Sequence, residues 1–337
     1  MKFWEYVLKR IILFIPVLFG TIIIIFLMSR LLPGNPVRLM LGPDAPMSQI
    51  IQVTNELGLN KPIYIQLEIF LVNFFQGKLG MSFLTYRDVS IDIAQYFPAS
   101  LEEAIFAIII ALLIGIPLGI SAGIKQNKAT DNAARIYAIA GISFPNFYVA
   151  ILLILIFGYY LKILPISGQI NPYITPPAKI TGMVIIDSLI TGDWPAFISS
   201  CRHIILPAFV LSISPTAQIV RLLRAGIIEN KNKAYYLTML SNGMNIDVLN
   251  RKYLFKISFI PTLSILGLLF ASIISFAYVV ETVFAWPGLG RYIANAVLYT
   301  DYNAIVGGTI VVVIIFMVVN FAMDLIYKYF DPRVRLD

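Results

Sequence analysis

The feature that most constrains this chain is a series of long apolar segments that carry almost no charge. A helix that crosses a bilayer needs about 20 consecutive apolar residues, and about six segments reach that length. They are Ile11–Leu32, Ala104–Ile124, Ile136–Leu161, Ile204–Leu223, Phe259–Val280 and Ala304–Tyr327. Because backbone polar groups in lipid must be satisfied within the protein, the sequence predicts an all-α polytopic membrane protein with about six transmembrane helices.

The composition agrees with this fold class and narrows the chemistry. Of 337 residues, 59% are hydrophobic and only 13% are charged, whereas soluble domains are about half apolar and about a quarter charged. The single cysteine, Cys201, and the single histidine, His203, exclude a disulfide framework and a multi-histidine metal site. We therefore expect a membrane protein without a metal centre.

The distribution of lysine and arginine predicts the orientation. Basic residues accumulate in cytoplasmic segments of membrane proteins, and most of the 25 lysines and arginines fall in inner segments if both termini are cytoplasmic. The loop at about 226–256 is then an inner loop, polar and basic, with a helical stretch predicted over Tyr235–Leu254. We divide the chain into residues 1–100, with the first span and a large first outer loop, and a core permease domain over residues 101–337.

Sequence motifs for enzyme chemistry are missing. A phosphate-binding loop ends in Gly-Lys-Ser/Thr, but the only Gly-Lys pair, Gly77-Lys78, precedes Leu79 and has no upstream glycine. Cys201 and His203 lie only two positions apart at the start of a span, and they do not make a convincing nucleophile–base pair. The sequence predicts a chain that is not an enzyme and binds no cofactor of its own.

Polar residues inside the spans leave two classes of transporter open. The acids Glu281 and Asp324 lie near span ends, whereas a proton-coupled transporter is expected to carry ionisable residues near the middle of the membrane. The first class is a pore-forming subunit that takes its energy from a partner ATPase. The alternative is a secondary transporter or channel that works without an ATPase. Hydroxyl and amide side chains in the later spans are expected either to bond between helices or to line a pathway: Ser212, Ser214, Thr216, Gln218, Ser272 and Ser275.

Several strings in order along the chain resemble one family, the B-type membrane subunit of the peptide/nickel class of ABC importers, which includes the oligopeptide and dipeptide permeases. The strings are "LLPGNPVRLMLG" (31–42), "ELGLNKPIYIQ" (56–66), "GKLGMS" (77–82), "PASLEEA" (98–104), "IPLGISAGIKQNKATDNAAR" (116–135), "GISFPNFYVAILLILIFGYYLKILPISG" (141–168), "RHIILPAFVLSISPTAQIVRLLRAG" (202–226), "VVETVFAWPGLGR" (279–291) and "DPRVR" (331–335).

The resemblance implies a type I ABC importer permease fold in the cytoplasmic membrane of a bacterium or archaeon. It implies a homologous second permease subunit as the partner in a heterodimer, two cytoplasmic ATPase subunits that bind ATP and magnesium, and an extracytoplasmic solute-binding protein. The expected cargo is an oligopeptide, a dipeptide or a small metal chelate such as a nickel complex. Nucleic acid is not an expected partner.

The resemblance also implies an ATPase-coupling segment in the inner loop. In that family a glycine is followed eighteen positions later by a proline, as Gly243 and Pro261 are here, and a glycine permits a sharp turn after a projecting helix. The implied coupling residues are Tyr235, Tyr236, Leu240, Ser241, Asn242, Gly243, Met244 and Pro261.

This segment departs from the family pattern. The family usually has a basic, alanine-rich run, whereas "AYYLTMLSNG" has Leu237 and Leu240 where arginines are common. We expect a more apolar contact, with Tyr235, Tyr236 and Leu240 packing into a cleft on the ATPase. A second departure is Lys78, where the family commonly has aspartate in a Gly-Asp-Leu-Gly string.

The string "ETVFAWPGLGR" is expected to form a tight outer turn between the last two spans, since proline and glycine favour turns. Its aromatic residues are expected to anchor at the membrane interface, and Glu281 to pair with Arg291. The resemblance implies an outer gate on the side of the binding protein, made by Glu281, Phe284, Trp286, Pro287, Gly288, Gly290 and Arg291. The alternative is that the turn only sets how one span leads into the next, and the two interpretations are compatible.

Overall fold

The computed structural model describes residues 3–31, 36–42 and 44–330. Within them five helices are long and apolar enough to cross a membrane, and a sixth span results if one bent helix pair is counted. The prediction of an all-α chain with about six spans is confirmed. Most of the first Pro-Gly turn, residues 32–35, and the string 331–335 lie outside the described residues.

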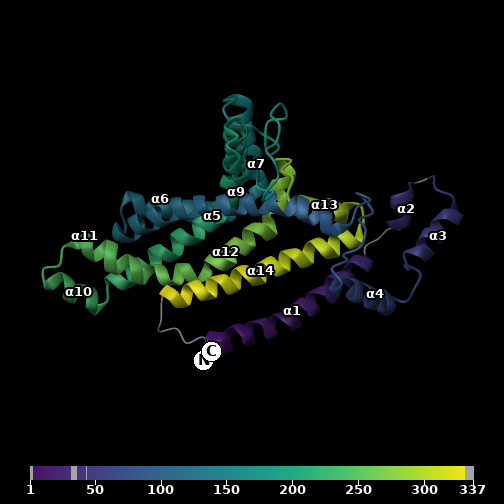
Figure 1. Cartoon of the computed structure of the whole chain (residues 1–337). Coiled ribbons are helices and arrows are strands. Elements are labelled where there is room, and N and C mark those ends of the chain that lie inside the picture. Colours follow the sequence, from purple (N-terminus) through teal and green to yellow (C-terminus); the bar gives the residue numbers. More distant parts are fainter. Residues whose placement is uncertain (1–2, 32–35, 43, 331–337) are drawn as a thin grey trace.

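Five long helices run side by side and make the body of the molecule (Figure 1). They are α1 (Phe3–Leu31), α5 (Val89–Ile124), α9 (Trp194–Lys231), α12 (Phe255–Val283) and α14 (Tyr302–Phe330). A row of glycines on α5 explains its close packing on α9: a Cβ atom at Gly115, Gly119 or Gly123 would lie about 2.7–3.1 Å from the facing Ile219, Leu223 or Ile227. Small residues spaced four apart let helix backbones approach each other in membranes.

Two helices begin earlier than their apolar runs. Helix α5 starts at Val89 and α9 at Trp194, where Asp88 accepts a hydrogen bond from the Ser90 amide and Asp193 accepts one from the Ala196 amide. Such side-chain caps satisfy amides that a helix start leaves free. The predicted start of the second span at Ala104 is therefore wrong, because α5 has polar and acidic turns before its apolar part.

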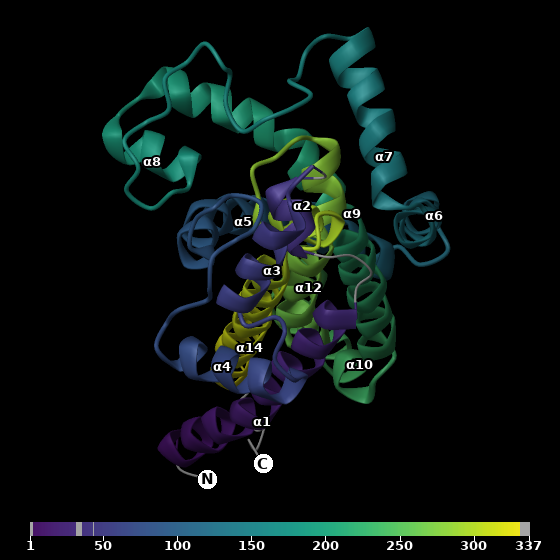
Figure 2. The same cartoon turned by 90° about the vertical axis from the view of Figure 1, so that its right-hand side faces the viewer.

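The expected span Ile136–Leu161 is not one continuous helix. The segment forms α6 (Ala129–Ser143), α7 (Asn146–Leu153) and a π-helix, η1 (Ile154–Tyr160), with a bend of 106° between α6 and the α7–η1 segment. Phe144 is extended, with φ −84° and ψ 130°, because the ring of Pro145 disfavours a helical conformation in the preceding residue. Figure 2 shows α7 and the region of α8 (Val184–Thr191) standing out on the side away from α1.

Other short helices lie at the two ends of the bundle (Figure 1). At one end, where α1 begins and α14 finishes, lies the α10 loop, residues 232–254. It contains α10 (Ala234–Ser241), α11 (Ile246–Val248) and the π-helix η2 (Leu249–Leu254). The opposite end, called the α13 end, carries α2 (Pro36–Leu41), α3 (Met47–Glu56), α4 (Ile63–Phe75) and α13 (Leu289–Leu298).

Candidate functional site

The string Glu281–Arg291 forms the turn from α12 into α13, and the carboxylate of Glu281 holds it together. Glu281 is fully buried. Its Oε2 accepts the Arg291 amide at 2.6 Å, its Oε1 accepts the Ser100 hydroxyl of α5, and the Leu289 amide donates to Ser100 Oγ at 2.7 Å. A carboxylate at a helix start accepts free amides and interacts favourably with the helix dipole. One side chain thus joins α5, α12 and α13.

Two positions in the turn require glycine because neighbouring atoms leave no room for a side chain, not because of their backbone angles. A Cβ atom at Gly288 would lie 2.2 Å from the Glu281 carboxyl group, and one at Gly290 would lie 2.8 Å from the backbone of Tyr278. Gly288 also occupies the N-cap position of α13, directly after Pro287, with φ −98°. Because the carboxylate can approach only where no side chain stands, Glu281 and Gly288 act as a matched pair.

The aromatic residues of the turn are not interface anchors, contrary to expectation. Phe284 and Trp286 are 2% and 0% exposed. The Trp286 indole Nε1 donates to the Ala99 carbonyl at 3.0 Å, and the Phe284 carbonyl accepts the Gly168 amide at 2.9 Å. The expected pairing of Glu281 with Arg291 does occur, but through the backbone amide of Arg291. The turn is therefore a packed junction.

Sequence reasoning missed two acids of α5 because it began that span at Ala104. Glu102 accepts the Ile185 amide at 2.8 Å and the Gln169 side chain at 2.9 Å, which fastens the segment before α9 to α5. Glu103 is fully buried, and within residues 3–31, 36–42 and 44–330 neither of its carboxyl oxygens has a hydrogen-bond partner. The pair "EE" directly before a long apolar run was the signal that could have found them.

Outside the spans, Asp187 closes the loop that precedes α8. It accepts the amides of Thr181 at 2.7 Å and Gly182 at 2.9 Å. Burial raises the pKa of the Asp187 carboxyl, but these hydrogen bonds outweigh burial and hold its pKa below the ordinary value. Hydrogen bonds to the charged form favour that form, so the loop is held by an ionised carboxylate.

A second polar junction joins the segment 81–92 to α13 and α14. The Tyr292 hydroxyl donates to Asp92 at 3.2 Å, and the Ser82 hydroxyl donates to Asp301 at 2.5 Å. Burial, together with the carboxylates of Asp92 and Asp301, raises the pKa of Tyr292. The tyrosine therefore stays protonated and serves as a hydrogen-bond donor.

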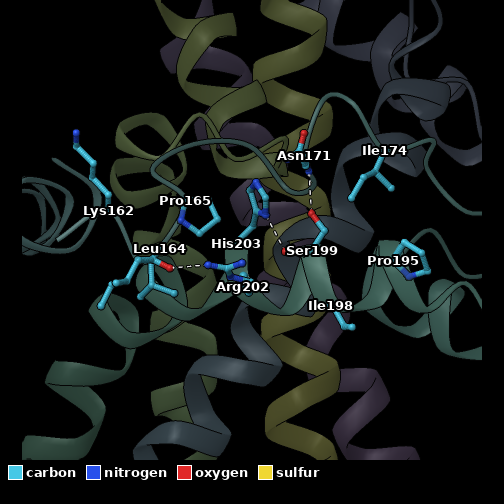
Figure 3. A pocket seen from close by; sticks show the side chains of 11 residues that line it. Lys162, Leu164, Pro165, Asn171, Ile174, Pro195, Ile198, Ser199, Arg202 and His203 are labelled. Carbon is cyan, nitrogen blue, oxygen red and sulfur yellow. Dashed lines mark hydrogen bonds between the residues drawn. The ribbon is translucent and has the colours of Figure 1, made fainter.

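A pocket of about 450 Å³ lies between the segment 162–174 and the start of α9 (Figure 3). The Arg202 guanidinium donates to the Ile163 carbonyl at 2.8 Å, and the Ser199 hydroxyl oxygen accepts the Asn171 amide at 3.0 Å. His203 Nδ1 lies 2.7 Å from the Ser199 carbonyl of its own helix. Cys201 stands two residues before His203, and residues two apart on a helix do not face each other, so the arrangement gives no support to a catalytic pair.

At the other end of α12, the α10 loop is fastened by one buried aromatic side chain. Tyr236 is 3% exposed and packs with Leu249 and Leu254 of η2. Its hydroxyl donates to the Asn250 side chain at 3.0 Å, and burial raises the pKa of this hydroxyl. Because η2 continues directly into α12, this contact connects α10 to a long span.

The predicted helical stretch over Tyr235–Leu254 is present, but a turn at residues 242–245 divides it. Helix α10 stops at Ser241, Gly243 has φ +78° with open space around it, and Asn245 caps the next short helix by accepting the Asp247 amide. A positive φ is easily adopted by glycine. Pro261 lies apart from this turn, within α12.

The solvent-facing side of α10 differs from the expected one. Tyr236 is turned inward, and Tyr235 is half-buried with its hydroxyl bonded to Asn230. Leu240 is 41% exposed as expected, and it is accompanied by Leu237 at 54% and Ile246 at 53%. Ser241 and Asn242 are exposed, and Met244 packs against the cluster around Tyr236. These exposed apolar residues form what we call the α10 face: Leu237, Leu240 and Ile246.

Most of the hydroxyl groups predicted for the later spans bond within their own helices. Four of the hydroxyl groups donate to carbonyls three or four residues earlier in their own helices: Ser212, Thr216, Ser272 and Ser275. Such back-bonding is a common fate of serine and threonine in helices. Ser214 and Gln218 are half-buried. Thr216 also shares a side-chain hydrogen bond with Tyr137 of α6, which is a bond between helices of the kind expected. Whether these residues line a pathway stays a prediction.

Comparison with known proteins identifies the family. Residues 115–336 match the model of the binding-protein-dependent transport system inner membrane component, and residues 3–104 match that of the N-terminal part of the same membrane component. The chain belongs to this family. Its members are the membrane components of ABC importers, so the chain is a multi-pass permease.

Curated relatives align over nearly their whole length with this permease. A dipeptide transport system permease protein of Alkalihalophilus pseudofirmus is 36% identical, over 98% of this chain and 99% of the relative. A probable D,D-dipeptide transport system permease protein of Escherichia coli is 34% identical, over 99% and 98%. A glutathione transport system permease protein of Escherichia coli is 31% identical, over 98% and 99%.

Proposed function

We propose that this permease is the membrane subunit of an ATP-driven importer of dipeptides or short oligopeptides. The names of the full-length relatives support peptides as the cargo class, because a dipeptide permease is 36% identical to this chain. The predicted nickel chelate has no such support among the relatives described above.

The observation that supports coupling to an ATPase is the exposure of the α10 face. Leu237, Leu240 and Ile246 are exposed, and they belong to α10 and α11, which lie at the end of the bundle (Figure 1). Exposed apolar side chains at such a place favour a site of protein contact. We infer that this face inserts into a cleft on one of two cytoplasmic ATPase subunits, which bind ATP and magnesium. Movement of α10 then reaches α12 through Tyr236, Leu249 and Leu254.

The proposed orientation places the α10 loop and both termini in the cytoplasm. The loop is rich in basic residues such as Lys233, Arg251 and Lys252, which favour the cytoplasmic side. The α13 end then faces outward, toward an extracytoplasmic solute-binding protein. A homologous second permease subunit pairs with the chain, and the pathway lies between the two.

Transport by the reconstituted complex tests this proposal. The chain would be co-purified with its permease, ATPase and binding-protein partners, placed in proteoliposomes, and supplied with a labelled dipeptide. We expect uptake that requires ATP and the binding protein and that unlabelled dipeptide suppresses more strongly than glutathione. Uptake that proceeds without ATP, driven by an ion gradient, would instead establish the alternative, a secondary transporter.

A further inference from the structure

A small polar pocket is lined by residues of α1, of α4 and of the start of α14. Figure 1 shows these parts of the three helices near the α13 end. Its volume is about 140 Å³. The polar side chains in its lining are two cations and three amides, and no carboxylate is among its lining residues: Arg30, Lys78, Gln66, Asn73 and Asn303. A pocket with this lining has an unbalanced positive charge.

The guanidinium group of Arg30 is held in place but not satisfied. It stacks over the ring of Phe26 at 5.0 Å and over that of Tyr302 at 4.6 Å. Its Nε and Nη1 atoms are buried, and neither has a hydrogen-bond partner among the residues that the structure describes. Burying charged donors without partners is costly, so this position calls for an acceptor that is itself negatively charged.

Helix α4 contributes an unsatisfied hydrogen-bond acceptor to the same pocket. Gln66 donates through Nε2 to the carbonyls of Leu59 and Lys61, at 3.2 and 2.8 Å, while its buried Oε1 has no partner in the described part of the chain. Gln66 and Asn73 are seven residues apart and lie on one face of α4, the face that lines the pocket. The pocket thus offers donors to an anion and one acceptor to a hydroxyl group.

The surroundings of the pocket are apolar and exposed. On α4, Tyr64, Val72 and Phe75 are 69%, 53% and 66% exposed, and on α1 Met28 is 64% exposed. Phe26 of α1 contacts Phe70 of α4, with ring centroids 5.6 Å apart. Arg30 stands at the last turn of a spanning helix, the depth at which lipid phosphates lie and basic side chains reach them. Acyl chains would find apolar surface on both sides.

We propose that this pocket binds the headgroup of an anionic phospholipid with a hydroxyl group, of the phosphatidylglycerol type. The phosphate accepts hydrogen bonds from Arg30 Nε and Nη1 and lies beside the Lys78 ammonium group. A headgroup hydroxyl donates to Gln66 Oε1. The lipid fills the junction of α1, α4 and α14, and it neutralises two cations that have no carboxylate beside them in the described pocket lining.

The test is a lipid titration of the purified full-length chain, delipidated in neutral detergent, with bound lipid counted by native mass spectrometry. We expect one saturable site for phosphatidylglycerol. Phosphatidylmethanol, which has the same charge but no hydroxyl group, should bind several-fold more weakly, and phosphatidylcholine should not compete. Free glycerol phosphate should not displace the lipid at equal concentration; if it does, the site is one for a soluble anion and the lipid assignment fails.

Three variants make the titration specific. Lys78→Asp changes an exposed side chain, so it should fold normally and lower the affinity about tenfold, because charge-assisted bonds to phosphate are among the strong ones. Arg30→Gln should lower it further. Lys61→Asp, an equal charge reversal at the opposite end of α4 and outside the pocket lining, should bind as the wild type does. Equal phosphatidylglycerol binding by wild type and Lys78→Asp would overturn the proposal.

Discussion

Helix α12 is held in opposite ways at its two ends. At the α13 end the buried Glu281 carboxylate collects hydrogen bonds from Ser100 and Arg291, and Trp286 is enclosed. At the other end the α10 loop is fastened mainly by Tyr236, and the α10 face is exposed. The difference indicates a rigid junction at one end of α12 and a movable attachment at the other.

This comparison suggests a division of labour within the proposed importer. Buried polar networks in which every group is bonded make local structure rigid, whereas segments with few buried contacts open at low free energy. A force applied to α10 would therefore move the start of α12 while the α12–α13 turn serves as the fixed point.

The largest stability effect is expected for Gly288→Ala at the rigid junction. The added Cβ atom would lie 2.2 Å from the Glu281 carboxyl group, which is already bonded on both sides, so the change should destabilise the protein by about 3 kcal/mol. The measurement is thermal unfolding of the purified chain in detergent, followed by tryptophan fluorescence. An unchanged melting temperature would show that the turn is not tightly packed.

Glu281→Gln should have the next largest effect. Glutamine keeps the size of the side chain but loses one acceptor and the negative charge, so the hydrogen bond from Ser100 or that from the Arg291 amide is weakened, at a cost of about 2 kcal/mol. The double variant with Ser100→Ala provides the control, because the two changes should be less than additive if the residues interact. Strict additivity of the two melting shifts would contradict the proposed junction.

Gly243→Ala should be milder and should act at the movable end. The residue has φ +78° and open space around it, so only backbone strain of about 1 kcal/mol opposes the alanine. The same change at Gly77, which also combines a positive φ with open space, is the matched control for strain alone. We expect similar unfolding in both variants but a loss of ATP-driven uptake only for Gly243→Ala.

The smallest effect is expected from acidification acting through Asp187. Its pKa in the folded protein is lowered, so the stability it contributes is present above the ordinary carboxyl pKa and is lost as the pH falls toward the folded value. The melting temperature of the wild type should therefore fall more steeply with acidification than that of Asp187→Asn. Parallel curves would show that the carboxylate does not hold the loop.

The sequence was sufficient to predict the fold class and the family, but not where the individual helices begin, bend and end. Long apolar runs located the spans, since the bilayer requires helices of that length. The early starts of α5 and α9 were missed, because the length of an apolar run does not register caps such as Asp88 and Asp193. The bend at Pro145 was missed because the apolar run continues through it.

The candidate site was predicted in its residues more than in its contacts. The pattern of proline and glycine indicated the turn at Glu281–Arg291, yet only the packing shows that Trp286 is enclosed and that Glu281 binds Ser100, a residue far away in the sequence. In the α10 loop the sequence could not reveal that Tyr236 turns inward, because a helix of eight residues has too little periodicity to define its buried side.

The most direct test of the account is whether the α10 face recruits the ATPase. Wild type, Leu240→Asp and Lys128→Asp would be compared in a pull-down with the partner ATPase in mild detergent, where Lys128 is an exposed residue of the turn between α5 and α6. We predict that the wild type and Lys128→Asp retain the ATPase, and that Leu240→Asp loses it while keeping its melting temperature. Equal retention by all three proteins would contradict the assignment of α10 as the coupling surface.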